Sequence, residues 1–202
     1  MTAQSLQEPT RLTVDPDVGA LLGGTGRYEK RLADLAGVFR DDVAYRTALA
    51  TTRDPDAPVY WVEESRLAGT GELITGISVL EPGSIGDEYY MTRGHLHARP
   101  ECAELYLAVA GRGVMLLDAL GGETRAIEIA AGEAVQVPGH WVHRSVNVGS
   151  DRFATIFCYS ADAGQDYQII ADAGGMRNLV LKDGTGGWTI RPNPDHRGYR
   201  HG

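Results

Sequence analysis

Two histidines separated by one residue, His95 and His97, are the first residues in this 202-residue chain that suggest chemistry. In an extended strand, alternate side chains point to the same face, so these two imidazoles would lie side by side. Neutral imidazole is a frequent metal ligand, and a pair of imidazoles suits a divalent transition ion. The spacing therefore predicts half of a metal site.

A carboxylate and a third histidine further along the chain are candidates for the other half. Glu104 and Tyr106 lie in a segment with strand character, where they would share one face, and an inward carboxylate is costly unless it is paired or bound to a metal. Glu101 is a rival ligand, but it follows a proline in a sequence typical of a loop. The third histidine is His143, which follows a Pro-Gly turn. His140 belongs to the same segment, and we expect it to lie at the surface or behind the ligands.

Two motifs in this order resemble the pair of motifs that defines the cupins. They are His95-x-His97 followed by Glu104 and Gly111, and then Gly132-x5-Pro138-x4-His143-x3-Asn147. Cupins hold a metal on three histidines and a glutamate, so the resemblance implies an all-β fold, a jelly-roll-like double-stranded β-barrel. Two details differ from the usual pattern: the gap between His97 and the glutamate is longer than in many cupins, and His140 stands where glycine is common.

Longer segments narrow the resemblance to one family, the cupin-type phosphoglucose isomerases, over about residues 20 to 193. These segments are Met91–His97, Ala103–Tyr106, Pro138–Asn147 and Ser160–Tyr167. Members of that family interconvert glucose 6-phosphate and fructose 6-phosphate as homodimers. The matching positions imply a metal held by His95, His97, Glu104 and His143, and a phosphate bound by Tyr60, Ser78, Thr92, Gly94 and Tyr167. Gln165 stands where many relatives have a histidine.

The chemistry of such an isomerase fits these residue types. Moving a carbonyl from C1 to C2 of an open-chain sugar requires a hydrogen to pass between the two carbons, as a proton or as a hydride. A metal that binds the two oxygens stabilises the negative charge that develops on them. We predict that Glu104 is the catalytic base and that Tyr106 is a second catalytic residue beside it. The donor set accepts Fe²⁺, which we favour, and also Mn²⁺, Ni²⁺ or Zn²⁺.

Two other functions are compatible with the same motifs. A cupin dioxygenase would activate O₂ at a similar metal site without a phosphate pocket, and a sugar-binding cupin would need no catalytic residue. An apolar pocket beside the metal would favour the dioxygenase. Hydroxyl groups that converge around Thr92 and Tyr167 would favour the phosphosugar isomerase.

The elements that must position these residues are mostly short strands. Ten segments rich in Val, Ile, Thr and Tyr, separated by Gly, Pro and Asp, suggest a sandwich or barrel. They are Val59–Val62, Leu73–Leu80, Glu88–Arg93, Leu105–Ala110, Val114–Asp118, Thr124–Ile129, Ala134–Val137, Phe153–Tyr159, Leu179–Lys182 and Trp188–Arg191. Apolar spacing predicts helices over Tyr28–Phe39, Asp41–Thr51 and around Asp166–Ala173. We therefore divide the chain into an N-terminal extension with short helices that packs on the barrel (1–57), the barrel (58–193) and a polar, partly disordered tail (194–202).

Composition limits the partners. The chain has 19 Lys and Arg against 27 Asp and Glu, and a net charge of −8 gives no support to nucleic-acid binding. No apolar run approaches the roughly 20 residues that cross a bilayer, and the N-terminal residues are not typical of a signal peptide. We expect a cytoplasmic protein, no membrane partner, and reduced Cys102 and Cys158. Surplus apolar residues, among them Leu32, Leu35 and Phe39, predict a two-fold homodimer, which the family resemblance also implies. The same resemblance implies a small sugar phosphate as the ligand.

Overall fold

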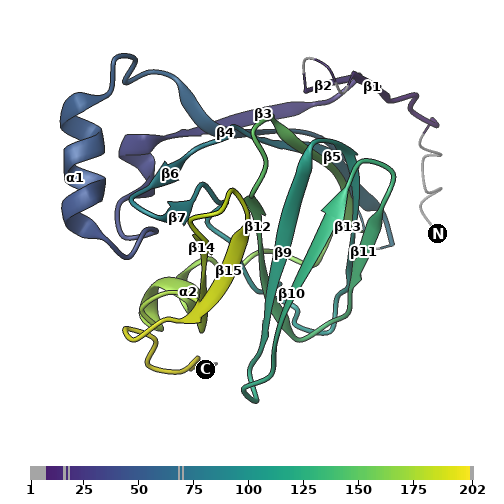
Figure 1. The fold of residues 1–202 in the computed structure, drawn as a ribbon. Coiled ribbons are helices and arrows are strands. Elements are labelled where there is room, and N and C mark those ends of the chain that lie inside the picture. The colour runs from purple at the N-terminus through teal and green to yellow at the C-terminus, as the bar shows by residue number, and fades with distance from the viewer. Residues whose placement is uncertain (1–7, 16, 18, 68, 70, 201–202) are drawn as a thin grey trace.

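Most of the regular secondary structure is β-strand, and the strands form sheets that curve around a buried interior (Figure 1). This computed structural model describes residues 8–15, 17, 19–67, 69 and 71–200. Its strands are β1 (Thr13–Asp15), β2 (Ala20–Leu22), β3 (Gly26–Arg31), β4 (Pro58–Arg66), β5 (Leu73–Leu80), β6 (Ser84–Ile85), β7 (Glu88–Tyr89), β8 (Glu104–Ala110), β9 (Arg112–Ala119), β10 (Thr124–Ala130), β11 (Ala134–Val137), β12 (Trp141–Asn147), β13 (Phe153–Ser160), β14 (Asn178–Lys182) and β15 (Trp188–Pro192). Its helices are the 3-10 helix η1 (Leu32–Leu35), α1 (Asp42–Thr51) and α2 (Gln168–Asp172). Within those described residues, no helix is both long enough and apolar enough to span a membrane.

Two antiparallel sheets form the barrel. The larger has the strand order β11-β8-β13-β5-β4-β3, and the smaller has the order β10-β9-β12. Side chains from both sheets, such as Phe157 on β13 and Met115 on β9, belong to one buried apolar cluster. Burial alternates along β8, where Glu104 and Tyr106 are buried and Leu105 between them is 46% exposed. The predicted all-β cupin barrel is confirmed, and the alternation places Glu104 and Tyr106 on its inner face.

One of the predicted N-terminal helices is wrong. Over Tyr28–Phe39, the chain first continues β3, which pairs with β4 at the edge of the larger sheet, and then makes only the short helix η1. The apolar spacing reflected burial rather than a helix, because Leu32, Leu35 and Phe39 are all buried. Pairing with β4 satisfies the backbone hydrogen-bonding groups of residues 28–31, and the spacing of apolar residues does not reveal this distant partner.

The other two predicted helices are present, and Asp41 caps the first of them as predicted. Helix α1 begins after Asp41, whose Oδ1 accepts a hydrogen bond of 2.9 Å from the backbone N–H of Ala44. Helix α2 is shorter than predicted, and Asp166 accepts hydrogen bonds from the backbone N–H groups of Gln168 and Ile169 before its first turn.

The strand β12 was not among the ten predicted strands. Its polar residues His143 to Ser145 and Asn147 interrupt the apolar pattern, yet every residue from Val142 to Asn147 is buried. Conversely, the predicted strand Glu88–Arg93 ends as β7 at Tyr89, and the residues that follow make only isolated bridges to β12.

The C-terminal segment packs against the body of the protein instead of being disordered. The hydroxyl of Tyr199 donates a hydrogen bond of 2.6 Å to Asp118, and the N–H of Arg197 donates one of 2.8 Å to the carbonyl of Ala173. Residues 201–202 of the predicted tail and residues 1–7 of the predicted extension lie outside the described residues. The division of the chain at residues 57 and 193 stays a prediction.

Candidate metal centre and adjoining pocket

Three histidines and one glutamate from three parts of the chain meet in the interior of the barrel. His143 lies on β12, Glu104 begins β8, and His95 and His97 lie in the segment after β7. The Nε2 atoms of His143, His97 and His95 lie 3.0, 3.3 and 3.5 Å from the Oε2 atom of Glu104. All four side chains are buried, and their candidate ligand atoms lie within 4.8 Å of one another. The predicted convergence is therefore present.

The two rival residues lie elsewhere. Glu101 is exposed, and its Oε1 atom lies 3.3 Å from the guanidinium of Arg99. His140 is also exposed, and among the described residues it is the one non-glycine residue with a positive φ, at +69°. Glycine adopts this left-handed conformation without a steric penalty, which explains physically why glycine is common at this position in cupins.

Backbone pairing fixes the histidines without a continuous strand. His95 and His143 form an isolated antiparallel bridge, with hydrogen bonds of 3.0 and 2.9 Å between their backbone groups. Leu96 makes a second bridge, to Asp166 in the segment before α2. The expectation that His95 and His97 lie on a regular strand is wrong, because these bridges to two different segments replace a ladder.

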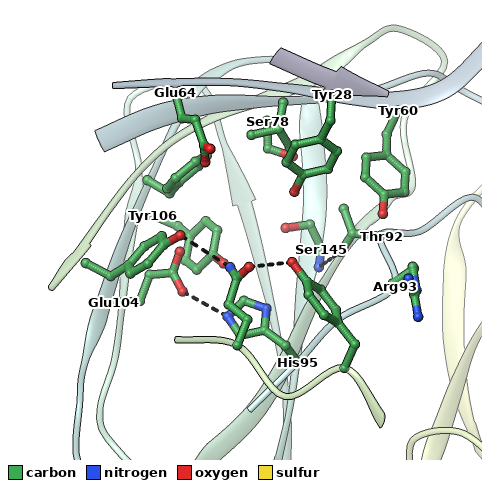
Figure 2. Close-up of a pocket in the computed structure, with 16 residues that line it drawn as sticks. Tyr28, Tyr60, Glu64, Ser78, Thr92, Arg93, His95, Glu104, Tyr106 and Ser145 are labelled. Atoms are coloured by element: carbon green, nitrogen blue, oxygen red, sulfur yellow. Dashed lines mark hydrogen bonds and ion pairs between the residues drawn. The ribbon is translucent and has the colours of Figure 1, made fainter. Parts of the chain in front are cut away.

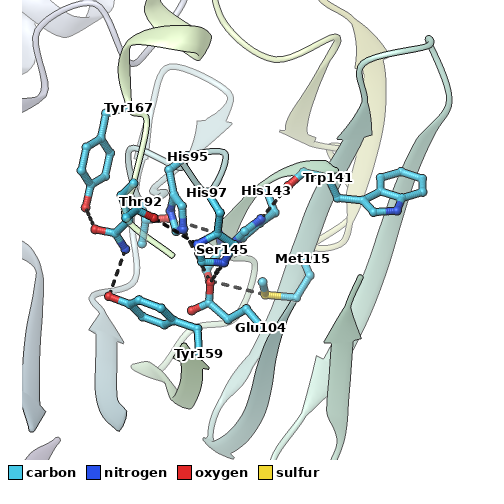
Figure 3. A network of polar contacts seen from close by, with 12 residues as sticks. Thr92, His95, His97, Glu104, Met115, Trp141, His143, Ser145, Tyr159 and Tyr167 are labelled. Carbon is cyan, nitrogen blue, oxygen red and sulfur yellow. Dashed lines mark hydrogen bonds and ion pairs between the residues drawn. The ribbon is translucent and has the colours of Figure 1, made fainter. Parts of the chain in front are cut away.

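Hydrogen bonds at the Nδ1 atoms of His97 and His143 fix which nitrogen of each ring carries the hydrogen (Figure 3). The Nδ1 atom of His97 lies 3.1 Å from the carbonyl oxygen of Gly164, and that of His143 lies 2.9 Å from the carbonyl oxygen of Trp141. A carbonyl only accepts, so each Nδ1 carries its hydrogen and each Nε2 of a neutral ring presents a lone pair. Lone pairs that face a carboxylate oxygen repel it unless a cation lies between them. The donor set thus fits a bound metal ion.

Burial sets the charge of each group in the cluster. Burial, reinforced by neighbouring His143, lowers the pKa of His95 to about 4, so this imidazole is neutral at neutral pH, as a ligand must be. Burial by itself would raise the pKa of Glu104, but the three imidazoles that surround its carboxylate outweigh burial and hold that pKa well below its usual range. Burial and the charge of Glu104 raise the pKa of Tyr106 well above its usual value, so Tyr106 is a neutral phenol.

A cavity adjoins the cluster on the side of His95 and Glu104, which both line it (Figure 2). It has an empty volume of about 500 Å³, which includes its open mouth. The predicted phosphate-binding residues and the predicted catalytic tyrosine all line it: Tyr60, Ser78, Thr92, Gly94, Tyr106 and Tyr167. The fold thus brings these residues together from β4, β5, β8 and two connecting segments.

A bend at Gly94 turns Thr92 and His95 toward the same cavity. Gly94 has a φ of +72°, and the N–H of Thr92 donates a hydrogen bond of 3.0 Å to the carbonyl of Ser145 on β12. The Thr92 hydroxyl accepts a bond of 3.2 Å from the N–H of Ser145, so its own hydrogen stays available to a ligand. In a straight strand, residues three apart would face opposite sides, and the bend removes this conflict.

Other residues that line the cavity were not among the predicted site residues. Gln165 bridges two tyrosines: its Nε2 atom lies 3.4 Å from the hydroxyl of Tyr159, and the hydroxyl of Tyr167 donates to its Oε1 atom. Glu64 is buried and pairs with Arg66. Glu64 could have been found from sequence, because it alternates with Tyr60 and Val62 along β4.

Comparisons with known proteins agree with this geometry. The family model described as glucose-6-phosphate isomerase (GPI) matches residues 29–197. A glucose-6-phosphate isomerase of Sinorhizobium medicae is 44% identical over 95% of this chain and 89% of its own length. Those of Thermococcus kodakarensis and Pyrococcus horikoshii are 37% and 38% identical, each over 88% of this chain and over 92% and 93% of their own lengths. This chain belongs to the glucose-6-phosphate isomerase family.

Proposed function

We propose that this protein interconverts glucose 6-phosphate and fructose 6-phosphate, the aldose–ketose isomerisation at the start of glycolysis and in gluconeogenesis. The observation that carries the proposal is the placement of the buried cluster of three histidines and Glu104 beside a cavity lined by hydroxyl groups. The hydroxyl-bearing side chains in this lining favour the phosphosugar isomerase over the dioxygenase alternative. Family membership and relatives named for this activity support the same assignment.

A divalent transition metal is part of the proposal, held by His95, His97, Glu104 and His143. When bound, such an ion polarises the carbonyl and hydroxyl oxygens of the sugar as a Lewis acid. We favour Fe²⁺ over Mn²⁺, Ni²⁺ and Zn²⁺, because a mixed imidazole and carboxylate set suits it. A tetrahedral Zn²⁺ ion would be filled by the four protein ligands and would leave no open position for the sugar.

Glu104 and Tyr106 are the proposed catalytic residues. Glu104 is ionised, lies at the inner end of the cavity, and is the carboxylate that would take a proton from C2 and return it to C1 if the hydrogen moves as a proton. Tyr106 stays protonated beside Glu104, so its hydroxyl would donate its hydrogen bond to a sugar oxygen. The isomerisation is balanced when a second proton passes from O2 to O1 of the sugar.

The phosphate group would bind at Tyr60, Ser78, Thr92, Gly94 and Tyr167. Burial raises the pKa of Tyr60 to about 12, which keeps its hydroxyl a donor. Hydroxyl and backbone N–H donors can bind a phosphate without a positively charged side chain.

An assay of protein stripped of metal and then reloaded tests the function. We expect chelator-treated protein to lose conversion of fructose 6-phosphate to glucose 6-phosphate, measured by a coupled dehydrogenase, and to regain it with Fe²⁺ more fully than with Mn²⁺, Ni²⁺ or Zn²⁺. Circular dichroism of the stripped protein is the control for unfolding. Folded protein that is reloaded with each metal and stays inactive would contradict the proposal.

Loss of single phosphate donors should weaken catalysis without removing metal. Because a hydrogen bond to a charged group is worth about 1.5–3 kcal/mol, we expect Thr92→Val and Tyr167→Phe each to lower kcat/KM by roughly 10- to 150-fold. Metal content, measured by mass spectrometry, should not change. Thr75→Val on β5 and Tyr45→Phe on α1 are matched controls, because neither residue lines the cavity. If the two site variants keep the wild-type preference for phosphorylated over unphosphorylated sugar, these residues do not bind the phosphate.

A cytoplasmic homodimer completes the proposal. Hexose phosphates are charged and do not cross bilayers unaided, so an enzyme that consumes them fits the cytoplasm. Exposed apolar side chains on the outer faces of the sheets, such as Leu105 and Ile127, offer surface that a second copy would cover.

A further inference from the structure

The open end of the cavity carries positive charge that no acidic residue neutralises. Arg93 lies between Thr92 and Gly94 and lines the cavity itself. It also lines an adjoining hollow with Lys30 and three tyrosines, Tyr28, Tyr60 and Tyr167, which are shared with the main cavity. No acidic residue lines this hollow, and neither Arg93 nor Lys30 has an ion pair with any residue in the described ranges.

The other end of the cavity holds the acidic groups. Figure 2 shows Glu64 and Glu104 on one side and Tyr60, Thr92 and Arg93 on the opposite side. Glu64 is already paired with Arg66, whereas Glu104 belongs to the histidine cluster. The cavity is therefore electrically polarised, although the whole chain has a net charge of −8.

Arg93 is held in position by an aromatic ring. Its guanidinium carbon lies 5.1 Å from the centroid of the Tyr167 ring, a stacking geometry that leaves the N–H groups at its edge free to bind a ligand. Its backbone carbonyl accepts a hydrogen bond of 2.8 Å from Arg144, a second, buried cation. A half-buried guanidinium without a counter-charge is costly, and an anion that binds beside it recovers that cost.

We propose that Arg93, assisted by Lys30, is the charge-selective element of the site and binds the dianionic phosphate of the sugar. This inference rests on the proposed function and adds to it two cations that the hydroxyl donors alone do not supply. Arg93 flanks Thr92 and Gly94, so one oxygen of the phosphate can take the hydroxyl and backbone donors while another takes the guanidinium. Attraction by unpaired cations also increases the rate of encounter and weakens with added salt.

Enzyme kinetics at several salt concentrations test the proposal on the metal-loaded protein. We expect Arg93→Gln to lower kcat/KM for the hexose phosphate by roughly 10- to 100-fold, mainly through KM, and Lys30→Gln to lower it several-fold. In the double variant, kcat/KM should respond much less to salt than in the wild type. Arg93→Lys, which keeps the charge, should keep most of the salt response. Arg152→Gln is the matched control, because Arg152 also stacks on an aromatic ring, Trp61, but does not line the cavity.

Calorimetric binding of inorganic phosphate separates this inference from the isomerase proposal, since it requires no turnover. We expect the wild type and Arg152→Gln to bind phosphate equally and the double variant to bind it at least roughly 10-fold more weakly, with unchanged metal content. If the double variant binds phosphate more weakly and the wild type has no isomerase activity, the proposed reaction is refuted while the anion site stands. Equal phosphate binding by the wild type and the double variant, or no binding by the wild type, would overturn the inference and assign Arg93 to packing against Tyr167.

Discussion

Replacement of Glu104 by Gln is expected to lower kcat by roughly 10²- to 10⁴-fold, the contribution of a positioned general base. The substitution keeps the size of the side chain but removes its negative charge and its ability to accept a proton from carbon. Glu104 lies 3.0 Å from the Nε2 atom of His143, so the substitution also weakens the metal site. Loss of activity alone would therefore not separate the two roles.

Measurement of the bound metal separates the role of Glu104 as a base from its role as a metal ligand. The Glu104→Gln variant should be assayed with saturating Fe²⁺, and its bound metal should be measured in the same sample. If the variant binds metal and stays inactive, Glu104 acts as the base. If saturating metal restores activity, Glu104 serves only as a ligand and the catalytic assignment is wrong.

A second carboxylate in the cavity provides the matched control. Glu64 is buried and lines the same cavity, but it is neutralised by Arg66 and lies outside the histidine cluster. We expect Glu64→Gln to lower kcat by less than roughly 10-fold, since only its pairing with Arg66 is lost. A loss as large as that of Glu104→Gln would move the base to Glu64.

Local rules predicted part of the cluster, and the resemblance to the cupin motifs supplied His143. Glu104 was preferred over Glu101 on the period of a strand, and β8 does place Glu104 inward with Tyr106. The spacing of His95 and His97 also predicted neighbouring imidazoles, although those residues make bridges to β12 and Asp166 rather than a regular strand. The prediction was robust because a short extended segment is enough to bring alternate side chains together.

Features that depend on distant pairing were not predictable in the same way. Residues Tyr28 to Arg31 extend the larger sheet because β4 offers an edge, which a helical spacing of apolar residues cannot reveal. Strand β12 was missed because the buried site requires polar residues where a strand pattern expects apolar ones. Likewise, the unpaired charge of Arg93 is apparent only when Lys30, 63 positions earlier in the chain, lies beside the same hollow.

Replacement of Gly94 by Ala is the second substitution with a large expected effect. A Cβ atom at this position would lie 2.8 Å from the carbonyl oxygen of His143 and 2.8 Å from the Cβ atom of Arg144. Both neighbours belong to β12, so relief of the clash must move the strand that carries His143. The φ of +72° adds about 1–2 kcal/mol for a non-glycine residue, and the overpacking adds about 1–3 kcal/mol.

We therefore expect Gly94→Ala to lower the free energy of unfolding by about 2–5 kcal/mol, measured by urea denaturation, and to lower kcat/KM in the fraction that stays folded. Gly184→Ala is the matched control: Gly184 has a similar φ of +80°, but its Cβ would have no neighbour within 4 Å. The control should lose only about 1–2 kcal/mol, the cost of the backbone conformation, and should keep full activity. The difference between the two variants measures the clash with β12. Equal losses of stability, or an unchanged kcat/KM in Gly94→Ala, would show that close packing at Gly94 does not position Thr92 and His95.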